Sequence, residues 1–290
     1  MPDTTEQINL RKENVDPVVR GFALQEFKLK PLVMTVSSSS FKETFWQETA
    51  TELTGGTGSS VQGVPRLSDF PYGEVKWTES SSRLIKFGMD SQISVEDERT
   101  AEFDVVARTL QRVGRAIANQ VDSHIWAVLS ESQSATNILS LAIAAGSEWD
   151  SATPANRDPL QNILNAMREI LKQNFDVYNG GHLLLNPTDF ANLMGNDDVK
   201  KVANFFTDDV TRNGKVGRIL GLSIVVSNVV TDDYAMVCLP KLAVSYKLAH
   251  DLSTEVIREP GIKVIIRAWE WGVAQLHNPK AVCLISNTQA

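Results

Sequence analysis

Cysteine is scarce in this chain of 290 residues, which contains only Cys238 and Cys283. Each lies in an apolar run with strand character, AMVCLP or AVCLIS, and no CxxC or Cys–His spacing accompanies either of them. Because metal centres need clustered ligands, the scarcity excludes a cysteine-based metal site. We expect two buried free thiols, since reduced cysteine packs as a small hydrophobic group, and the sequence gives a disulfide no support.

Long hydrophobic runs are missing as well. No apolar stretch reaches the roughly 18 residues that a membrane helix needs. The opening residues MPDTTEQINLRKENVDP contain no apolar core of a signal peptide. We therefore expect a soluble chain of intracellular origin that contacts no membrane.

Basic residues are outnumbered, with 28 lysines and arginines against 35 aspartates and glutamates, and the net charge is −7. A protein that binds nucleic acid with its whole surface usually carries the opposite charge. The balance argues against that class of protein, although it leaves room for a local basic patch.

Catalytic and ligand-binding patterns are also lacking. The four histidines, His124, His182, His250 and His277, show no metal-ligand spacing, and the sequence proposes no partners for general acid–base catalysis. The GxSxG element is absent. The TGGTGSS stretch at residues 54–60 lacks the lysine and the preceding strand of a phosphate-binding loop. We predict no catalytic residue, no cofactor and no metal ligand, and hence no enzyme.

The strongest positive feature is a predicted amphipathic helix from Ser94 to Ser130. Ser94 and Asp97 form a capping box, and acidic residues in the first turn suit the helix dipole. About 33 residues at 1.5 Å each give a rod of roughly 50 Å. Apolar residues at steps of three and four make one continuous stripe, which consists of Phe103, Val106, Leu110, Val113, Ile117, Val121, Ile125 and Val128.

The segment before this helix shows no core pattern over residues 1–60, yet it contains more large apolar groups than a disordered tail would. We expect an arm that is extended alone and buried on a partner subunit. Residues 61–95 then predict a two-stranded hairpin, in which EVKWTE pairs with RLIKFGMDSQISV across a turn at Ser80–Ser82. An isolated hairpin is only marginally stable in water, so it too would gain by lying on another subunit.

Mixed α/β patterns follow the long helix. DPLQNILNAMREI predicts a helix capped by Asp158, HLLLNP a buried strand, and VGRILGLSIVV two strands joined by a bend at Gly221. Further strands are predicted in YAMVCLP, LAVSYKLA, STEVIRE and AVCLIS, and GIKVIIRAWEWGVAQLH predicts one that is longer than most. Trp269 and Trp271 share one face of that strand and need a large partner surface, which is either the long helix or another subunit.

Five of these segments, in this order, resemble the major capsid proteins of tailed bacteriophages, whose fold encapsulins share. RLIKFGMDSQISVEDER resembles the return strand of the E-loop entering the spine helix, and DPLQNILNAMREI resembles the first helix of the axial domain. HLLLNPTDFANLM resembles the family's strand, Asn-Pro and short helix. GRILGLSIVVSNVV resembles its Leu-x-Gly segment, with Ser223 where proline is common, and VIIRAWEWGVAQLHNPKAVCLI resembles the last two strands.

The resemblance, which covers about Gly63 to Ser286, implies an α+β fold of the Hong Kong 97 type. The expected parts are an N-terminal arm (1–60), an E-loop hairpin (61–95), a peripheral domain with the spine helix (96–150 and 251–290) and an axial domain (151–250). Many relatives carry an N-terminal scaffolding segment that is cleaved off. We expect no such segment in this chain, so the resemblance implies a separate scaffold protein or none.

The implied function is structural: self-assembly as hexamers and pentamers into the icosahedral capsid of a virion, around double-stranded DNA that is contacted without sequence specificity. Portal and decoration proteins are the other expected partners, and assembly is expected in the host cytoplasm. An encapsulin-type compartment holding a cargo enzyme is the alternative, and an ordinary α/β enzyme with a flexible N-terminus is a third hypothesis. The residues expected at contacts between subunits are Phe22, Phe27, Phe41, Phe45, Lys76, Trp77 and Lys86.

Overall fold

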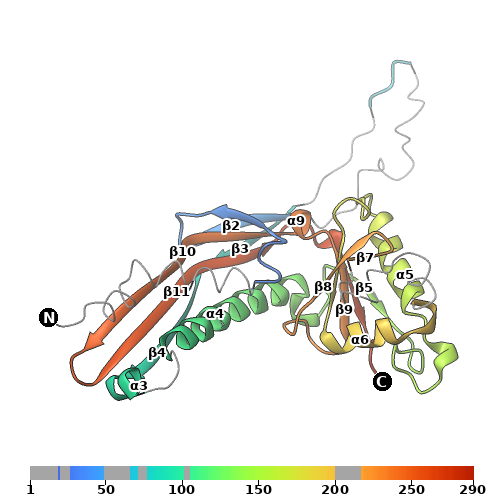
Figure 1. Ribbon diagram of the computed structural model, residues 1–290. Helices are drawn as coiled ribbons and strands as arrows, with labels where there is room; N and C mark the ends of the chain where they lie inside the picture. The colour runs from blue at the N-terminus through green and yellow to red at the C-terminus, as the bar shows by residue number, and fades with distance from the viewer. Residues whose placement is uncertain (1–18, 20–26, 49–65, 71–76, 101–104, 200–216) are drawn as a thin grey trace.

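The structure is a computed structural model that describes residue 19 and residues 27–48, 66–70, 77–100, 105–199 and 217–290. Within these ranges the chain forms two parts of different shape (Figure 1). A long four-stranded sheet carries a long helix on one face and a two-stranded ribbon on the other. A six-stranded sheet with shorter helices lies beside it.

The long sheet has the strand order β1-β10-β11-β4, with β1 parallel to β10 and the other pairs antiparallel. Gly261 makes the turn between β10 and β11 with a φ of +74°, a conformation that glycine adopts without steric cost. LAVSYKLA and STEVIRE were predicted as two strands. From Val244 on they form one strand that continues through two register shifts, and Leu242 and Ala243 belong to a short helix before it. The strand bounds are β1 (Met34–Ser37), β4 (Ile85–Ser94), β10 (Val244–Glu259) and β11 (Lys263–Leu276).

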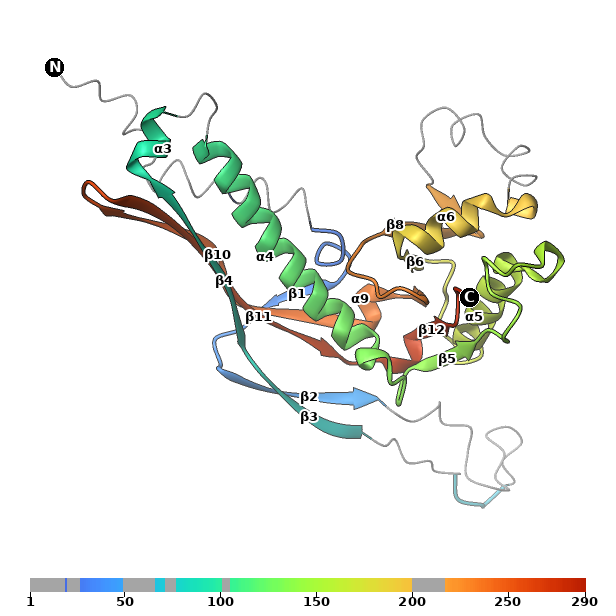
Figure 2. The same ribbon diagram turned by 90° about the horizontal axis from the view of Figure 1, so that it is seen from below.

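Helix α4 (Val105–Leu129) crosses this sheet and packs against it with the predicted apolar stripe (Figure 2). The predicted rod from Ser94 is described instead as two helices, α3 (Val95–Thr100) and α4. The predicted cap is confirmed, because Asp97 N–H donates to Ser94 Oγ over 2.9 Å. Phe103 and the side chain of Val106 lie outside the described residues. Five stripe residues are buried, as predicted: Leu110, Val113, Ile117, Val121 and Ile125.

The second sheet joins strands from distant parts of the chain in the order β5-β12-β9-β6-β8-β7. Gly221 makes the predicted bend between β7 and β8 with a φ of +84°. The pairing of β12 with β9 brings the last strand into the region predicted as the axial domain. The bounds are β5 (Leu139–Ala142), β6 (His182–Leu185), β7 (Arg218–Ile219), β8 (Leu222–Val226), β9 (Tyr234–Cys238) and β12 (Val282–Ser286).

Two capped helices accompany this sheet, α5 (Pro159–Leu171) and α6 (Pro187–Gly195). Gln161 N–H donates to Asp158 Oδ1 over 3.0 Å, and Thr188 N–H donates to Asn186 Oδ1 over 2.9 Å. The two cysteines are buried and free, as predicted. Shorter helical segments are α9 (Pro240–Ala243) and the 3-10 turns Glu131–Gln133, Pro154–Asn156 and Pro279–Ala281.

The ribbon consists of β2 (Lys42–Glu48) and β3 (Trp77–Arg83), and its pairing differs from the predicted hairpin. Ser80–Ser82 were expected to form a turn, but they lie inside β3, which is followed after Leu84 by β4. β3 pairs with β2, whereas β4 pairs with β11. The prediction was wrong because strand propensity depends on context, and the partners of both strands are distant in sequence.

Residues 27–33 form a segment that we call the strap, which contacts both α4 and the long sheet. Phe27, Leu29 and Val33 are buried in the core of their own chain. This burial corrects the expectation that the apolar groups of residues 1–60 are covered only by a partner subunit. Only Phe27 and Leu29 alternate with polar neighbours, and so short a pattern does not identify a core segment from sequence.

Candidate assembly surfaces

The strap is held on α4 by one buried carboxylate. Asp122 accepts hydrogen bonds from three consecutive backbone N–H groups, those of Lys28 (2.6 Å), Leu29 (3.1 Å) and Lys30 (3.0 Å). Burial raises the pKa of Asp122, and the three donors act in the opposite direction because they stabilise the charged form. These bonds set the register of the strap on the helix.

Lys30 joins the same segment to the sheet. Its ammonium lies 2.7 and 2.8 Å from the two carboxylate oxygens of Glu270, which is fully buried in β11. Tyr246 Oη donates to Glu270 Oε1 over 2.9 Å, and the ammonium lies over the rings of Phe27 (4.6 Å) and Tyr246 (5.4 Å). Gly272 leaves room for the tyrosine, because a Cβ there would lie 2.7 Å from Tyr246 Cε1. A buried charge needs such partners, so this cluster determines where the N-terminal segment meets the subunit body.

The inner face of the β2–β3 ribbon rests on the end of the long sheet. Phe45 meets the ring of His277 edge-on with 5.3 Å between centroids, and Gln275 Nε2 donates to Ser82 Oγ over 2.6 Å. Ser245 Oγ and His277 Nε2 are hydrogen-bonded at 2.6 Å. Burial lowers the pKa of His277, so the imidazole is neutral near pH 7 and provides a packing surface for the ribbon.

The outer face of the ribbon exposes two tryptophans. The strand register places Trp46 opposite Glu79 and Trp77 opposite Glu48, and residues opposite one another in a sheet share a face. Trp46 is 55% exposed and Trp77 is 53% exposed. A soluble monomer rarely leaves neighbouring groups of this size uncovered, which favours a protein partner for this face.

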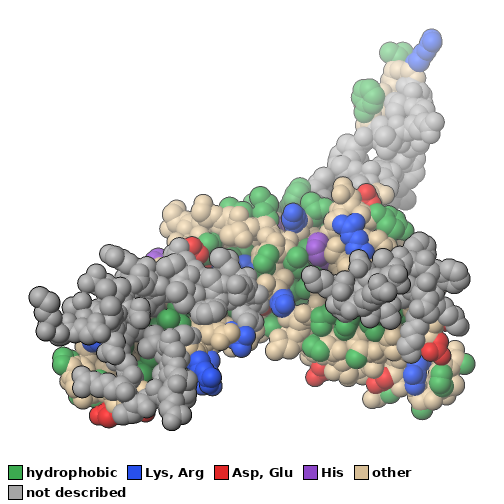
Figure 3. Space-filling view, viewed as in Figure 1, with side chains coloured by type: hydrophobic (Ala, Val, Ile, Leu, Met, Phe, Trp, Pro, Cys, Tyr) green, Lys and Arg blue, Asp and Glu red, His purple; other side chains and the backbone are tan. Residues whose placement is uncertain are grey.

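Residues 66–70 also expose apolar side chains. The described residues 66–70 lie far from both sheets in Figure 1, and Figure 3 shows hydrophobic and basic side chains there. Leu67 is fully exposed and Phe70 is 84% exposed. Both side chains therefore point into solvent in a single subunit.

A third aromatic surface lies on the sheet face opposite α4. The ammonium of Lys86 is 5.8 Å from the ring centre of Trp269 and 5.7 Å from that of Trp271, distances at which cation–π attraction acts. His250 stacks on Trp269 at 6.1 Å and is tilted against Trp271 at 6.2 Å. The predicted packing of these tryptophans on the long helix is wrong. Ala268 and Glu270, which alternate with them along β11, are buried on the side of α4, so the tryptophans point to the other side of the sheet.

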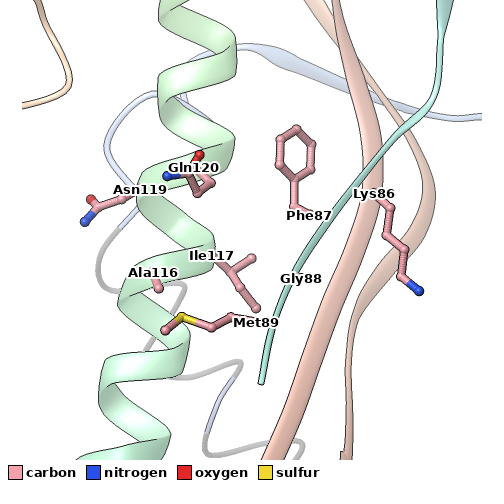
Figure 4. A pocket seen from close by; sticks show the side chains of 8 residues that line it. All are labelled: Lys86, Phe87, Gly88, Met89, Ala116, Ile117, Asn119 and Gln120. Atoms are coloured by element: carbon pink, nitrogen blue, oxygen red, sulfur yellow. The ribbon is translucent and has the colours of Figure 1, made fainter. Parts of the chain in front are cut away.

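A cavity of about 430 Å³ lies between α4 and the edge strand β4 (Figure 4). Its apolar lining comes from Phe87 and Met89 on the strand and Ile117 on the helix, and Asn119 and Gln120 add amide groups. Figure 4 shows that the side chain of Lys86, at the same site, points away from the helix. Carboxylates and imidazoles do not line the cavity, so it offers an apolar contact surface rather than acid–base chemistry.

No reaction centre is evident in the described ranges. Among these residues, no three His, Cys, Asp or Glu side chains gather as a metal site requires. The Ser245–His277 pair lacks, within the same ranges, a carboxylate hydrogen-bonded to the imidazole, which would complete a nucleophile–base–orienter arrangement. None of the helices in the described part of the chain combines the length and the apolar content needed to cross a membrane.

The residues predicted at subunit contacts lie in different environments. Phe27 is buried in the strap and Phe45 faces His277, so neither offers a full surface to a partner. Two lie outside the described residues, Phe22 and Lys76. Three have exposed side chains, Phe41, Trp77 and Lys86.

Sequence reasoning missed Trp46, Leu67 and Phe70. Phe45 and Trp46 point to opposite faces of any strand, so reading KETFWQE as a strand would have shown that one of the two is exposed. Leu67 and Phe70 lie in no periodic pattern, and only the structure reveals their exposure.

Comparisons with known proteins agree with this geometry. A sequence profile described as phage capsid protein matches residues 78–285. The capsid structure of cyanophage P-SCSP1u is 16% identical over 88% of this chain and 86% of that chain, with a TM-score of 0.66. The virus-like particle from Pyrococcus furiosus is 13% identical over 94% of this chain and 98% of that chain, with a TM-score of 0.62. The structure of Mycobacterium phage Che8 is 20% identical over 87% of this chain and 86% of that chain, with a TM-score of 0.59. A search of curated proteins gave no match.

Proposed function

Because this chain belongs to the phage capsid protein family and has the predicted α+β fold of the Hong Kong 97 type, we propose that it assembles as hexamers and pentamers into an icosahedral shell around viral double-stranded DNA. The family match does not favour the encapsulin-type alternative. The proposal includes assembly in the host cytoplasm, with portal, scaffold and decoration proteins as further partners. The subunit acts as a structural protein and carries out no catalysis.

The observation that supports this proposal most directly is the exposure of aromatic side chains on the outer face of the ribbon and at residues 66–70. A lone subunit leaves Trp46, Trp77 and Phe70 largely in water. Full burial of such a side chain stabilises by about 1.5–3 kcal/mol, so neighbouring copies that cover these groups supply free energy for association. Every copy carries the same exposed aromatic groups and the same surface that would cover them on a neighbour. Head-to-tail contacts of this kind form rings when the rotation between copies closes.

Each part of the subunit has a role in this proposal. In this proposal the E-loop, predicted as residues 61–95, includes the β2–β3 ribbon and lies over an adjacent subunit. The peripheral domain is the long sheet with α4 as its spine helix. The axial domain, predicted as residues 151–250, also includes β5 and β12 and meets its copies at the capsomer centre.

A double substitution on the ribbon tests the proposal. We expect Trp46→Ser with Trp77→Ser to abolish shell formation while the subunit stays folded, because both side chains are exposed and contribute little to the subunit core. The matched control, Trp46→Phe with Trp77→Phe, keeps large aromatic surfaces and should still assemble. Electron microscopy and light scattering would measure assembly, and circular dichroism would verify folding.

Two results would contradict the proposal. One is a wild-type chain that stays a compact monomer under every assembly condition, with or without scaffold. The other is normal shells from the serine double variant, which would mean that the ribbon face isn't the contact that drives assembly.

A further inference from the structure

The side of α4 that faces away from the long sheet carries a row of arginines. Arg108, Arg112 and Arg115 are exposed there, opposite the buried stripe. Their spacing of four and three residues places them on one helix face, with rises of about 6 and 4.5 Å between successive positions. Asn119, also exposed, continues the same row by one further turn. We call these four residues the arginine row.

This face is locally positive in a chain that is negative overall. The 25 residues of α4 include one acidic residue, Asp122, and its carboxylate is buried by the strap's N–H groups. The strap adds Lys28, whose backbone N–H binds Asp122 and whose side chain is exposed. The chain as a whole has 35 acidic and 28 basic residues.

The opposite side of the long sheet also carries basic residues, and Lys86 lies there over Trp269 and Trp271. Arg267 on this side is paired with Asp90 at 2.8 Å, and Lys263 with Glu259 at 3.8 Å. The cations of this side thus have acidic or aromatic partners, whereas α4 presents three arginines on one exposed helix face.

Guanidinium groups in such a row match a phosphodiester backbone. Arginine binds phosphate through two parallel N–H···O bonds, and duplex DNA carries one negative charge per about 1.7 Å of its axis. Arg108 and Arg115 each make a further contact within the chain, and five N–H donors per guanidinium leave capacity for phosphate. Arg112, between them, is exposed as well.

We propose that the arginine row of α4 binds the phosphate backbone of the packaged double-stranded DNA without reading its sequence. This inference rests on the proposed function, and it orients the subunit with α4 toward the shell interior and the exposed tryptophans of the ribbon away from the DNA. The contact is electrostatic, so its affinity falls steeply with salt.

A salt titration of DNA binding tests the inference. Full-length subunits, kept below the concentration at which they assemble, are titrated onto a fluorescent duplex of about 20 base pairs, long enough to exceed the length of α4. We expect Arg108→Gln/Arg112→Gln/Arg115→Gln to weaken binding at least about tenfold at low salt and to reduce the slope of log K against log salt by about 2 to 3, since each phosphate contact contributes about 0.9 to that slope. The charge-matched control, Lys172→Gln/Arg218→Gln/Lys241→Gln, removes three exposed cations elsewhere and should leave both values unchanged.

Further variants separate the remaining explanations. The triple lysine variant of the row retains the charge and should restore most of the affinity and the full salt slope. Arg112→Gln alone should reduce the slope by about 1, and it serves if the triple variant does not fold. Equal loss of binding in the row variant and the control would overturn the inference, as would wild-type subunits that do not bind the duplex at low salt.

Assembly provides the independent check. A row variant that forms normal shells but binds DNA weakly supports the inference. A row variant that binds DNA normally but fails to assemble would overturn it and assign the row to contact with another protein. Failure of the wild-type chain to assemble at all would instead contradict the proposed function, whatever the DNA titration shows.

Discussion

Lys30 is a charged residue largely inside the protein, and its neighbours explain how the fold tolerates it. Its ammonium contacts both oxygens of Glu270, which has a fully buried side chain. Lys28, two residues earlier, has an exposed side chain and contributes only its backbone N–H, which donates to Asp122. The two lysines have the same side chain and lie in the same segment, so a comparison of their substitutions measures how much the buried ion pair contributes to stability.

We expect Lys30→Ala to destabilise the subunit by about 3–5 kcal/mol, because it leaves the buried carboxylate of Glu270 without its cation. Lys28→Ala should cost within about 0.5 kcal/mol, since its side chain is in solvent and the backbone bond remains. Urea unfolding of unassembled subunits, followed by circular dichroism, measures both. Equal losses from the two substitutions would show that the Lys30–Glu270 pair does not stabilise the strap.

Among the elements, helix α4 carries three different surfaces: the apolar stripe, the contact with the strap and the arginine row. Its apolar stripe was predictable from sequence, because the spacing of Leu110, Val113 and Ile117 is a local property. Its contact with the strap was not predictable, because the partner of Asp122 lies 94 residues away in sequence. From sequence alone, a lone aspartate on a helix is expected to be solvated, and only the structure shows that the strap buries it.

Val113→Asp should prevent the subunit from folding, whereas Arg112→Ala should not. Val113 is fully buried and Arg112, its neighbour, is exposed. An unpaired carboxylate in the core costs several kcal/mol, comparable to the whole stability of a domain, and loss of the exposed arginine should cost about 1 kcal/mol or less. Soluble expression and cooperative thermal unfolding distinguish the two. A folded Val113→Asp subunit would mean that this side of α4 does not face the core.

For the whole molecule, the order of elements was predictable and the pairing of distant segments was not. Asp158 and Gly221 mark a helix start and a bend through local backbone chemistry alone. The pairing of β2 with β3, of β1 with β10, and the contact of Lys30 with Glu270 across 240 residues depend on the completed fold. The exposed ribbon face was predicted in part for the same reason: Trp77 was identified, but Trp46 belongs to a strand that the sequence did not reveal.

Removal of residues 1–45 is expected to unfold the subunit, not merely to block assembly. The deletion removes the strap, β1 and half of β2, and Phe27, Leu29 and Val33 each contribute about 1.5–3 kcal/mol by burial. The sum approaches the 5–15 kcal/mol typical of a whole domain. Circular dichroism and a thermal melt of the truncated chain provide the measurement. A cooperative melt close to that of the full chain would show that the strap is dispensable for the subunit and acts only between copies.

Because both cysteines are buried, the native subunit should not react with thiol reagents. Burial raises the pKa of Cys238 and of Cys283 to about 12, so only about one thiol in ten thousand is the reactive thiolate at pH 8, and neither sulfur is accessible. A single engineered cysteine, such as Ser81→Cys on the exposed outer face of the ribbon, would therefore be the one labelling handle on each subunit. Maleimide labelling of assembled particles would then measure the fraction of subunits whose ribbon still faces the solvent, because a ribbon covered by a neighbour would not react.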